Sequence, residues 1–216
     1  MDNFIDLLLP PFLETIYMVF ASTLASLLIG FPLGILLVIT EKNGIWQKPK
    51  LNYILGTIVN VSRSFPFIIL MILVFPISKL IVGTTIGTTA SIVPLSIAAC
   101  PFVARVIESS LKEVDKGIVE SVSAMGASVP EIVFKVLIPE AMPSLVLGTT
   151  LTIINLISYS AMAGAIGGGG LGDLAIRYGF YRFQTDVMIA SVILIILLVQ
   201  TVQLTGNKVA KIVNKK

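Results

Sequence analysis

The chain has 216 residues, of which 56% are hydrophobic and 12% are charged, whereas soluble domains carry about 25% charged residues. Together with long uncharged runs, this composition indicates an integral membrane protein and excludes an ordinary soluble domain. A net charge of only +3, a single cysteine and no histidine argue against nucleic-acid binding, a disulfide framework within the chain and a Cys/His metal site.

The first uncharged run covers residues 15–40 and exceeds the length of about 20 residues that a membrane-crossing helix needs. Gly30, Pro32 and Gly34 lie toward its end, where they predict either a kink or close helix packing. No Lys or Arg precedes the run, and a secretory signal needs a basic n-region. We therefore expect a first membrane span and no cleavable signal peptide.

The second run, residues 51–78, is interrupted by Arg63 and Pro66. An arginine that faced lipid would be energetically costly. Either the helix begins late, near residue 58, and Arg63 reaches the cytoplasmic interface, or Arg63 faces an inner cavity or a partner protein. We favour the first of these interpretations.

Three further runs complete the chain. The third covers residues 80–104, but its first part, GTTIGTT (83–89), predicts a loop and places the helix at roughly 90–107. The fourth run covers residues 141–172 and the fifth covers residues 187–207. The sequence thus predicts an all-α integral membrane fold of five transmembrane helices, with the two termini on opposite sides of the membrane.

The basic residues predict how these spans are oriented. With the N-terminus outside, twelve of the fifteen basic residues face the cytoplasm and three face the opposite side. The twelve are Lys42, Lys48, Lys50, Arg63, Arg105, Lys112, Lys116, Lys135, Lys208, Lys211, Lys215 and Lys216, and the three are Lys79, Arg177 and Arg182. Because cytoplasmic loops are enriched in Lys and Arg, we expect an N-out, C-in topology.

A charged and amphipathic stretch, residues 117–139, lies between the third and fourth spans; we term it the central segment. Its first nine residues predict a short helix that ends in a turn at Gly126. Ser128 and Glu131 have the spacing of a capping box, which predicts a second helix, and Pro139 is expected to end that helix. The central segment is thus either a cytoplasmic contact site for a soluble partner or a loop without a special role.

Each predicted helix of the central segment has an apolar face at helical spacing. The face of the first helix comprises Ile118, Val122 and Met125. The face of the second helix comprises Ile132, Val133, Val136 and Leu137.

The order of Glu, Gly and Ile-Pro in the central segment resembles the cytoplasmic "EAA" loop of ABC importer permeases. That loop has the sequence E-A-A, a glycine a few residues later, and finally an apolar residue followed by Pro. The matches are Glu120, Gly126, Ile138 and Pro139. Ser121 and Val122 replace the two alanines, which is a departure from the family pattern.

The resemblance extends over nearly the whole chain. RSFPFIILM (63–71), IVGTTIG (81–87), PFVARVIESSL (101–111) and SYSAMAGAIGGGGLGDLA (158–175) are similar to the methionine importer permeases, the membrane subunits of D-/L-methionine ABC transporters. The resemblance implies that residues 1–216 form a single type I permease domain in the bacterial cytoplasmic membrane. Two copies would enclose the path for methionine, and five spans alone could hardly do so.

The resemblance also implies two partners, an ABC ATPase dimer that binds ATP and Mg, and an extracytoplasmic methionine-binding lipoprotein. The chain itself has no Gly-x-x-x-x-Gly-Lys-Ser/Thr phosphate loop, and the resemblance assigns it no catalytic residue and no metal ligand. The residues implied in coupling to the ATPase are Glu120, Gly126, Ser128, Glu131, Ile138 and Pro139. The apolar face of the second helix is expected to fill a groove on the ATPase.

The fourth span carries the candidate residues of the translocation path, Tyr159, Ser160 and Met162. These side chains either line or gate the path, or their polar groups make hydrogen bonds between helices. The stretch GAIGGGGLG that follows is too rich in glycine for a regular helix end. Its glycines 167–170 form either a non-helical pore mouth or a tight loop.

Two other functions stay open at this point. An ABC permease for another small amino acid or osmolyte would share the features of the central segment. An ion-gradient-driven secondary carrier predicts an ionisable residue deep in a span, and four of the five spans have none between their flanking charges. A membrane enzyme would need a nucleophile and base constellation, and the spans show none.

Overall fold

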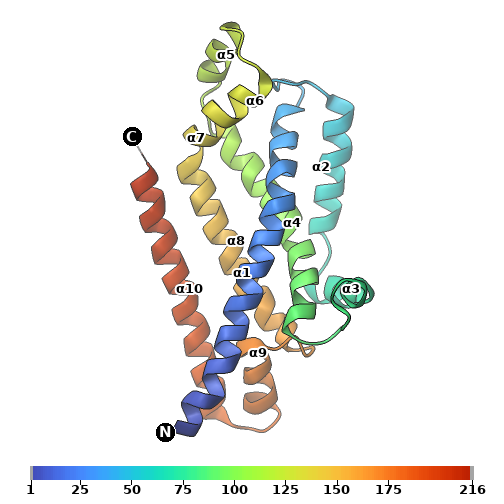
Figure 1. Ribbon diagram of the computed structural model, residues 1–216, viewed down its shortest axis with the longest axis vertical. Coiled ribbons are helices and arrows are strands. Elements are labelled where there is room, and N and C mark those ends of the chain that lie inside the picture. The colour runs from blue at the N-terminus through green and yellow to red at the C-terminus, as the bar shows by residue number, and fades with distance from the viewer. Residues whose placement is uncertain (1, 215–216) are drawn as a thin grey trace. The chain divides into compact units, whose positions relative to one another are not determined.

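The computed structural model describes residues 2–214, and these residues form helices and no strand (Figure 1). The helices are α1 (Asp2–Ile39), α2 (Pro49–Arg63), α3 (Phe67–Val82), α4 (Thr88–Lys112), α5 (Lys116–Ala124), α6 (Val129–Ile132), α7 (Ile138–Glu140), α8 (Met142–Gly164), α9 (Gly170–Leu174) and α10 (Thr185–Val213). Two π-helical turns are η1 (Val133–Leu137) and η2 (Ala175–Phe180). Lys215 and Lys216, counted above among the cytoplasmic charges, lie outside the described residues.

Four helices are each long and apolar enough to cross a membrane, namely α1, α4, α8 and α10. Helices α2 and α3 pass the same test only as a pair, which is bent by 106° at a short break between Arg63 and Phe67. The described part of the chain therefore has four candidate spans, or five if the bent pair is one span. This count agrees with the helical membrane fold that the sequence predicts.

The second span departs from its predicted form. Helix α2 begins at Pro49, in the first helical turn where a missing N–H does no harm, so the expected start near residue 58 is wrong. Arg63 is the last residue of α2 and is exposed. Pro66 has an extended backbone and disfavours a helical conformation of the residue before it. The uncharged run is therefore divided into two helices.

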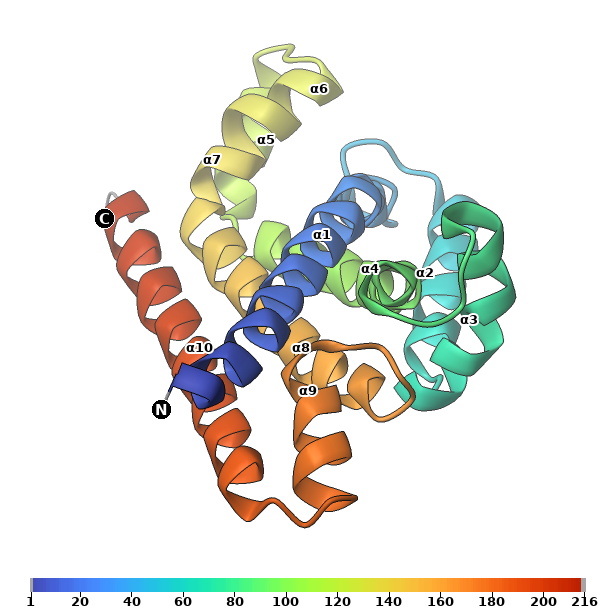
Figure 2. The same cartoon turned by 60° about the horizontal axis from the view of Figure 1, so that its bottom comes forward.

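The chain divides into two compact units. Unit 1 comprises Met1–Ala25, Phe65–Ala99 and Thr152–Gln203. Its buried core is made of apolar side chains, including Met18, Met71, Leu95, Leu156 and Ile157. Figure 2 shows how α8 turns through the following loop into α9 within this unit.

Unit 2 comprises Ser26–Ser64, Cys100–Leu151 and Leu204–Lys216. Glycines 30 and 34 of α1 allow this helix to approach α4 closely. A Cβ at Gly30 would lie 2.8 Å from the carbonyl oxygen of Cys100, and a Cβ at Gly34 would lie 2.6 Å from the Cβ of Ile107. Of the two effects that these glycines predict, close helix packing is therefore confirmed.

Candidate functional site

The central segment lies in unit 2 and begins with helix α5. The Asp115 carboxylate caps this helix by accepting hydrogen bonds from the N–H groups of Gly117 at 2.7 Å and Ile118 at 3.3 Å. The helix ends at Ala124, and Gly126 follows with a φ of +82°. The predicted short helix and the glycine turn are both confirmed, because a left-handed residue directly after a helix is the position that favours glycine.

Ser128 and Glu131 form the predicted capping box at the start of α6. The Glu131 carboxylate accepts hydrogen bonds from the Ser128 N–H at 3.0 Å and the Ser128 hydroxyl at 2.7 Å, and Lys135 donates to it at 2.9 Å. Lys135, followed by Ser128, lowers the pKa of the Glu131 carboxyl from its ordinary 4.5 to about 2. The carboxylate therefore stays ionised at every physiological pH.

Pro139 does not end the second helix, contrary to the expectation. In a regular helix its ring would clash with the carbonyl group four residues earlier. The π turn η1 lies directly before it, and the Ile138 N–H reaches back to the carbonyl of Val133. After the proline, the Ala141 N–H bonds to the carbonyl of Leu137 at 3.0 Å, which restores the α-helical pattern. The wider π turn thus accommodates the proline, and the helical backbone continues toward α8.

The apolar face predicted for the second helix packs inside the chain itself. Ile132, Val133 and Leu137 are buried in a core that they share with residues of α1 and α4, so this face is not available to fill a groove on a partner. The exposed large apolar side chains of the segment are Ile118, Met125 and Phe134, at 41%, 85% and 66% exposure. Phe134 is not among the residues predicted from the sequence. It is a large apolar residue that follows Val133 directly but lies outside the apolar face predicted for the helix, and this position is the signal that could have identified it as exposed.

The other residues assigned to coupling lie on the surface of the same segment. Glu120 and Pro139 are exposed, and Ile138 is half-buried against the core. The six predicted residues therefore lie along one continuous stretch of short helices, in which Ser128 and Glu131 are bonded to each other. Its outer surface combines charged groups with the three exposed apolar side chains.

The three candidate path residues of α8, in unit 1, do not have a common environment. The ring of Tyr159 is stacked on Phe67 of α3, with centroids 4.5 Å apart and planes 5° apart. Ser160 is buried, and its hydroxyl donates to the carbonyl of Ile157 in its own helix at 2.7 Å. Met162 is exposed over 39% of its surface. The Ser160 bond is thus made within α8, whereas Tyr159 reaches another helix through its ring.

The glycine stretch of unit 1 is a tight loop, residues 165–169, that helix α1 and the α3–α4 loop hold in place. The Glu14 carboxylate accepts the Gly170 N–H at 2.8 Å, and the Gly167 carbonyl accepts the Gly87 N–H at 3.1 Å. Gly167 and Gly170 have φ angles of +84° and +77°. Residues with a side chain rarely adopt this backbone conformation, which explains the glycines at these two positions.

Unit 1 also contains an almost entirely apolar pocket of about 240 Å³ between α1, α8 and α10, lined among others by Val19, Thr23, Ile157 and Leu198. None of the three candidate path residues lines it. Among the residues that the structure describes, no group of three or more His, Cys, Asp or Glu side chains is placed to hold a metal ion.

Comparison with known proteins gives a consistent result. Residues 30–216 match the family described as "Binding-protein-dependent transport system inner membrane component". The chain is 49% identical to the "Probable D-methionine transport system permease protein MetI" of Vibrio cholerae, over 98% of this chain and 94% of that protein. It is 43% identical to the "Methionine import system permease protein MetP" of Bacillus subtilis, over 94% of this chain and 91% of that protein.

Solved structures extend this comparison to the fold. A chain of the MetNI methionine ABC transporter, from a study of its inward-facing conformations, superposes with a TM-score of 0.97 at 41% identity and complete coverage of both chains. An amino acid ABC transporter crystallised with histidines gives a TM-score of 0.73 at 19% identity, over 98% of this chain and 94% of that chain. The second likeness is one of fold alone.

Proposed function

The chain belongs to the family of binding-protein-dependent transport system inner membrane components, and on this premise we propose that it is the permease subunit of an ATP-driven methionine importer. The observation that carries the proposal is its similarity, over nearly its full length, to permeases named for methionine transport in two bacteria. It is a multi-pass protein of the bacterial cytoplasmic membrane. Neither a different substrate nor a secondary carrier has an observation in its favour.

We propose that residues 1–216 act as one type I permease domain with five spans, in which α2 and α3 together make the second span. The N-terminus would then lie outside and the C-terminus inside. The bias of basic residues toward the loop after α1, the central segment and the C-terminal tail supports this topology. The central segment would face the cytoplasm, where an ATPase can reach it.

Coupling to a separate ATPase dimer, which would hold ATP and Mg, is assigned to the central segment. Glu120, Gly126, Ser128, Glu131, Ile138 and Pro139 would carry this role. Because the buried face of the second helix serves the permease's own core, the contact with the ATPase would be made by the outer surface with Met125 and Phe134. Large apolar side chains exposed outside the spans are typical of a protein interface, and a helix in a groove is the matching mode of recognition.

The translocation path would lie between two copies of the chain, since five spans from one copy can hardly enclose it. Tyr159, Ser160 and Met162 of α8 would line or gate it, with Met162 presenting an exposed thioether. An extracytoplasmic methionine-binding lipoprotein would deliver the substrate. The family name, which specifies binding-protein-dependent transport, supports this last partner.

Uptake of labelled methionine into proteoliposomes tests the proposed function. The permease is reconstituted with its ATPase and binding lipoprotein. ATP is enclosed inside the vesicles, because the ATPase of an importer that fills them faces the lumen. We expect ATP-dependent uptake that methionine analogues compete and that is lost without the ATPase. Uptake that is independent of ATP, or that methionine analogues do not affect, would contradict the proposal.

A further inference from the structure

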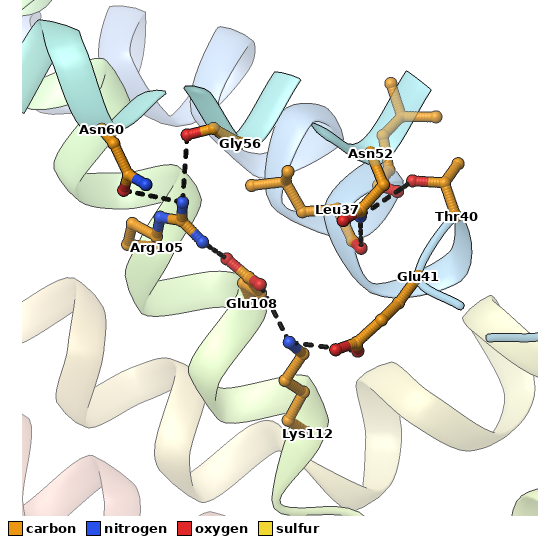
Figure 3. A network of polar contacts seen from close by, with 10 residues as sticks. Leu37, Thr40, Glu41, Asn52, Gly56, Asn60, Arg105, Glu108 and Lys112 are labelled. Atoms are coloured by element: carbon orange, nitrogen blue, oxygen red, sulfur yellow. Dashed lines mark hydrogen bonds and ion pairs between the residues drawn. The ribbon is translucent and has the colours of Figure 1, made fainter. Parts of the chain in front are cut away.

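A row of charged side chains runs along one face of α4 in unit 2 (Figure 3). Arg105, Glu108 and Lys112 occupy positions i, i+3 and i+7, which share a helix face. The Arg105 guanidinium donates to the Glu108 carboxylate at 2.5 Å and, with its second nitrogen, to the backbone carbonyl of Gly56 at 3.1 Å and the side-chain oxygen of Asn60 at 2.8 Å. Arg105 therefore joins α4 to α2.

The same row continues to the end of α1. Glu108 is only 8% exposed, and its other oxygen accepts a hydrogen bond from Lys112 at 3.0 Å. Lys112 also pairs with Glu41 at 3.1 Å. Buried charges in an apolar chain are costly unless each is paired. Every charge of this row has a partner, and Figure 3 shows them in an unbroken sequence from α2 to the loop after α1.

Helix α2 has few other anchors in unit 2. Its one buried side chain is Val59, which packs in a small cluster with Leu37 and Ala104. Near its start, the Asn52 side chain donates to the Leu37 carbonyl at 2.6 Å, a bond to α1. The polar bridge between the second half of α2 and α4 is thus made by a single side chain, Arg105.

The C-terminal end of α4, where Lys112 lies, is packed against the central segment. Leu111 and Val114 are buried in the same core as Ile132, Val133 and Leu137. Because cores are close-packed and change arrangement as units, a displacement of the central segment acts on the end of α4. The bonds of Arg105 lie about two turns from that end.

We propose that Arg105 is a positioning residue for transport, which passes the movement of the central segment from α4 to α2. This inference rests on the proposed function. The guanidinium is suited to the task because its planar fork holds a carboxylate, a backbone carbonyl and an amide oxygen at once, whereas a lysine ammonium is a single point charge on a flexible stem. Without these guanidinium bonds, α4 still moves with the ATPase, but the movement of α4 is no longer passed to α2.

The test compares Arg105→Gln and Arg105→Lys in the complex reconstituted with its ATPase and binding lipoprotein. The readout is the number of ATP molecules hydrolysed per methionine transported. We expect this ratio to rise about fivefold to tenfold in both variants, mainly because transport falls. Hydrogen exchange of the α2 backbone should also rise in both, since α2 loses its bridge to α4. Lys208→Gln, which removes one positive charge from the exposed face of α10, is the control and should leave the ratio unchanged.

Arg105→Lys separates the bridge from simple charge balance, because lysine can still neutralise Glu108. A wild-type ratio in this variant would overturn the proposal, and so would a parallel loss of transport and ATP hydrolysis, which indicates a damaged fold. If the wild-type complex itself fails to transport methionine, the proposed function fails. If the wild type transports and the Arg105 variants match it, only the present inference fails.

Discussion

Gly126 shows how one residue shapes the central segment. Its φ is +82°, and a Cβ added to it would meet no atom within 4 Å, so the cost of a substitution comes from the backbone alone. An L-residue in this conformation costs roughly 1–2 kcal/mol, and Asn tolerates it best. We therefore expect Gly126→Ala and Gly126→Asp to lower substrate-stimulated ATP hydrolysis in the reconstituted complex without loss of the permease, and Gly126→Asn to lower it less.

The order of these variants is the decisive observation for Gly126. If Gly126→Asn and Gly126→Ala lower ATP hydrolysis equally, the loss is caused by side-chain contacts with the ATPase and not by the backbone conformation. Unchanged transport and ATP hydrolysis in all three variants would contradict a role of Gly126 in coupling.

Glu131 gives a prediction on pH. The pKa of its carboxyl is lowered to about 2 by Lys135 and Ser128, so the ionised form is favoured in the folded chain. The contribution of the capping box to stability is therefore fully present above pH 4.5 and is lost as the pH falls toward 2. In a titration from about pH 6 to about pH 3, the carboxyl carbon-13 resonance of Glu131, identified with Glu131→Gln, should remain that of a carboxylate.

Lys135→Met provides the matched comparison for Glu131. It removes the largest cause of the lowered pKa, so the midpoint should move up toward 4.5 and become visible within the same range. A midpoint near 4.5 in the wild type would contradict the ion pair and the capping box together.

The local features of the site could be predicted from the sequence. The glycine turn and the Ser128/Glu131 capping box depend on residues within a few positions of each other, so spacing alone identifies them. The environment of the apolar face could not be predicted. Ile132 and Leu137 are apolar at helical spacing whether they face a partner or their own core, and only packing against α1 and α4 decides between the two.

At the scale of the elements, glycines set how closely helices approach. A Cβ at Gly206 of α10 would overlap the side chain of Thr150 of α8, lying 2.5 Å from its Cγ2 methyl group. Thr150 is buried and bonded to the Val146 carbonyl at 2.8 Å, so it has little freedom to give way. We expect Gly206→Ala to destabilise the protein by about 1–3 kcal/mol through overpacking, measured as a lower unfolding temperature in detergent.

Gly56→Ala is the control for this packing effect. A Cβ at Gly56 would come no closer than 3.7 Å to the Arg105 side chain, and alanine favours a helix over glycine by about 1 kcal/mol. This variant should therefore unfold at the same temperature as the wild type or at a higher one. If Gly56→Ala lowers the unfolding temperature as much as Gly206→Ala does, close helix contact is not the cause of the lost stability in Gly206→Ala.

Element boundaries are predictable where charges or glycines mark them, as at the start of α4 and the end of α8. The break between α2 and α3 is visible in the sequence as Arg63 and Pro66, yet these residues equally fit a late helix start. Uncharged length alone does not separate one interrupted span from two helices. The expectation for Pro139 is wrong for a related reason, because a π turn lets a helix continue past a proline, and no simple spacing rule predicts that turn.

At the scale of the whole molecule, topology depends on whether the bent pair α2 and α3 crosses the membrane. If it crosses, the loop after α1 and the loop after α3 lie on opposite sides; if it re-enters, they lie on the same side. The distribution of Lys and Arg favours crossing, with the loop after α1 in the cytoplasm. Asn43 and Thr84 are exposed in these two loops and can report on each side after Cys100→Ala removes the one native cysteine.

We expect Thr84→Cys to react with a membrane-impermeant maleimide in intact spheroplasts, and Asn43→Cys to react only after the membrane is permeabilised. Reaction of both cysteines from the same side would contradict five spans. If Asn43→Cys alone reacts from outside, the orientation is the opposite of the one proposed. Two crossings, the bent pair and α4, separate the loop after α1 from the central segment, so both lie on the same side of the membrane. With the opposite orientation the central segment would therefore face away from any cytoplasmic ATPase, and the proposed coupling would fail together with the topology.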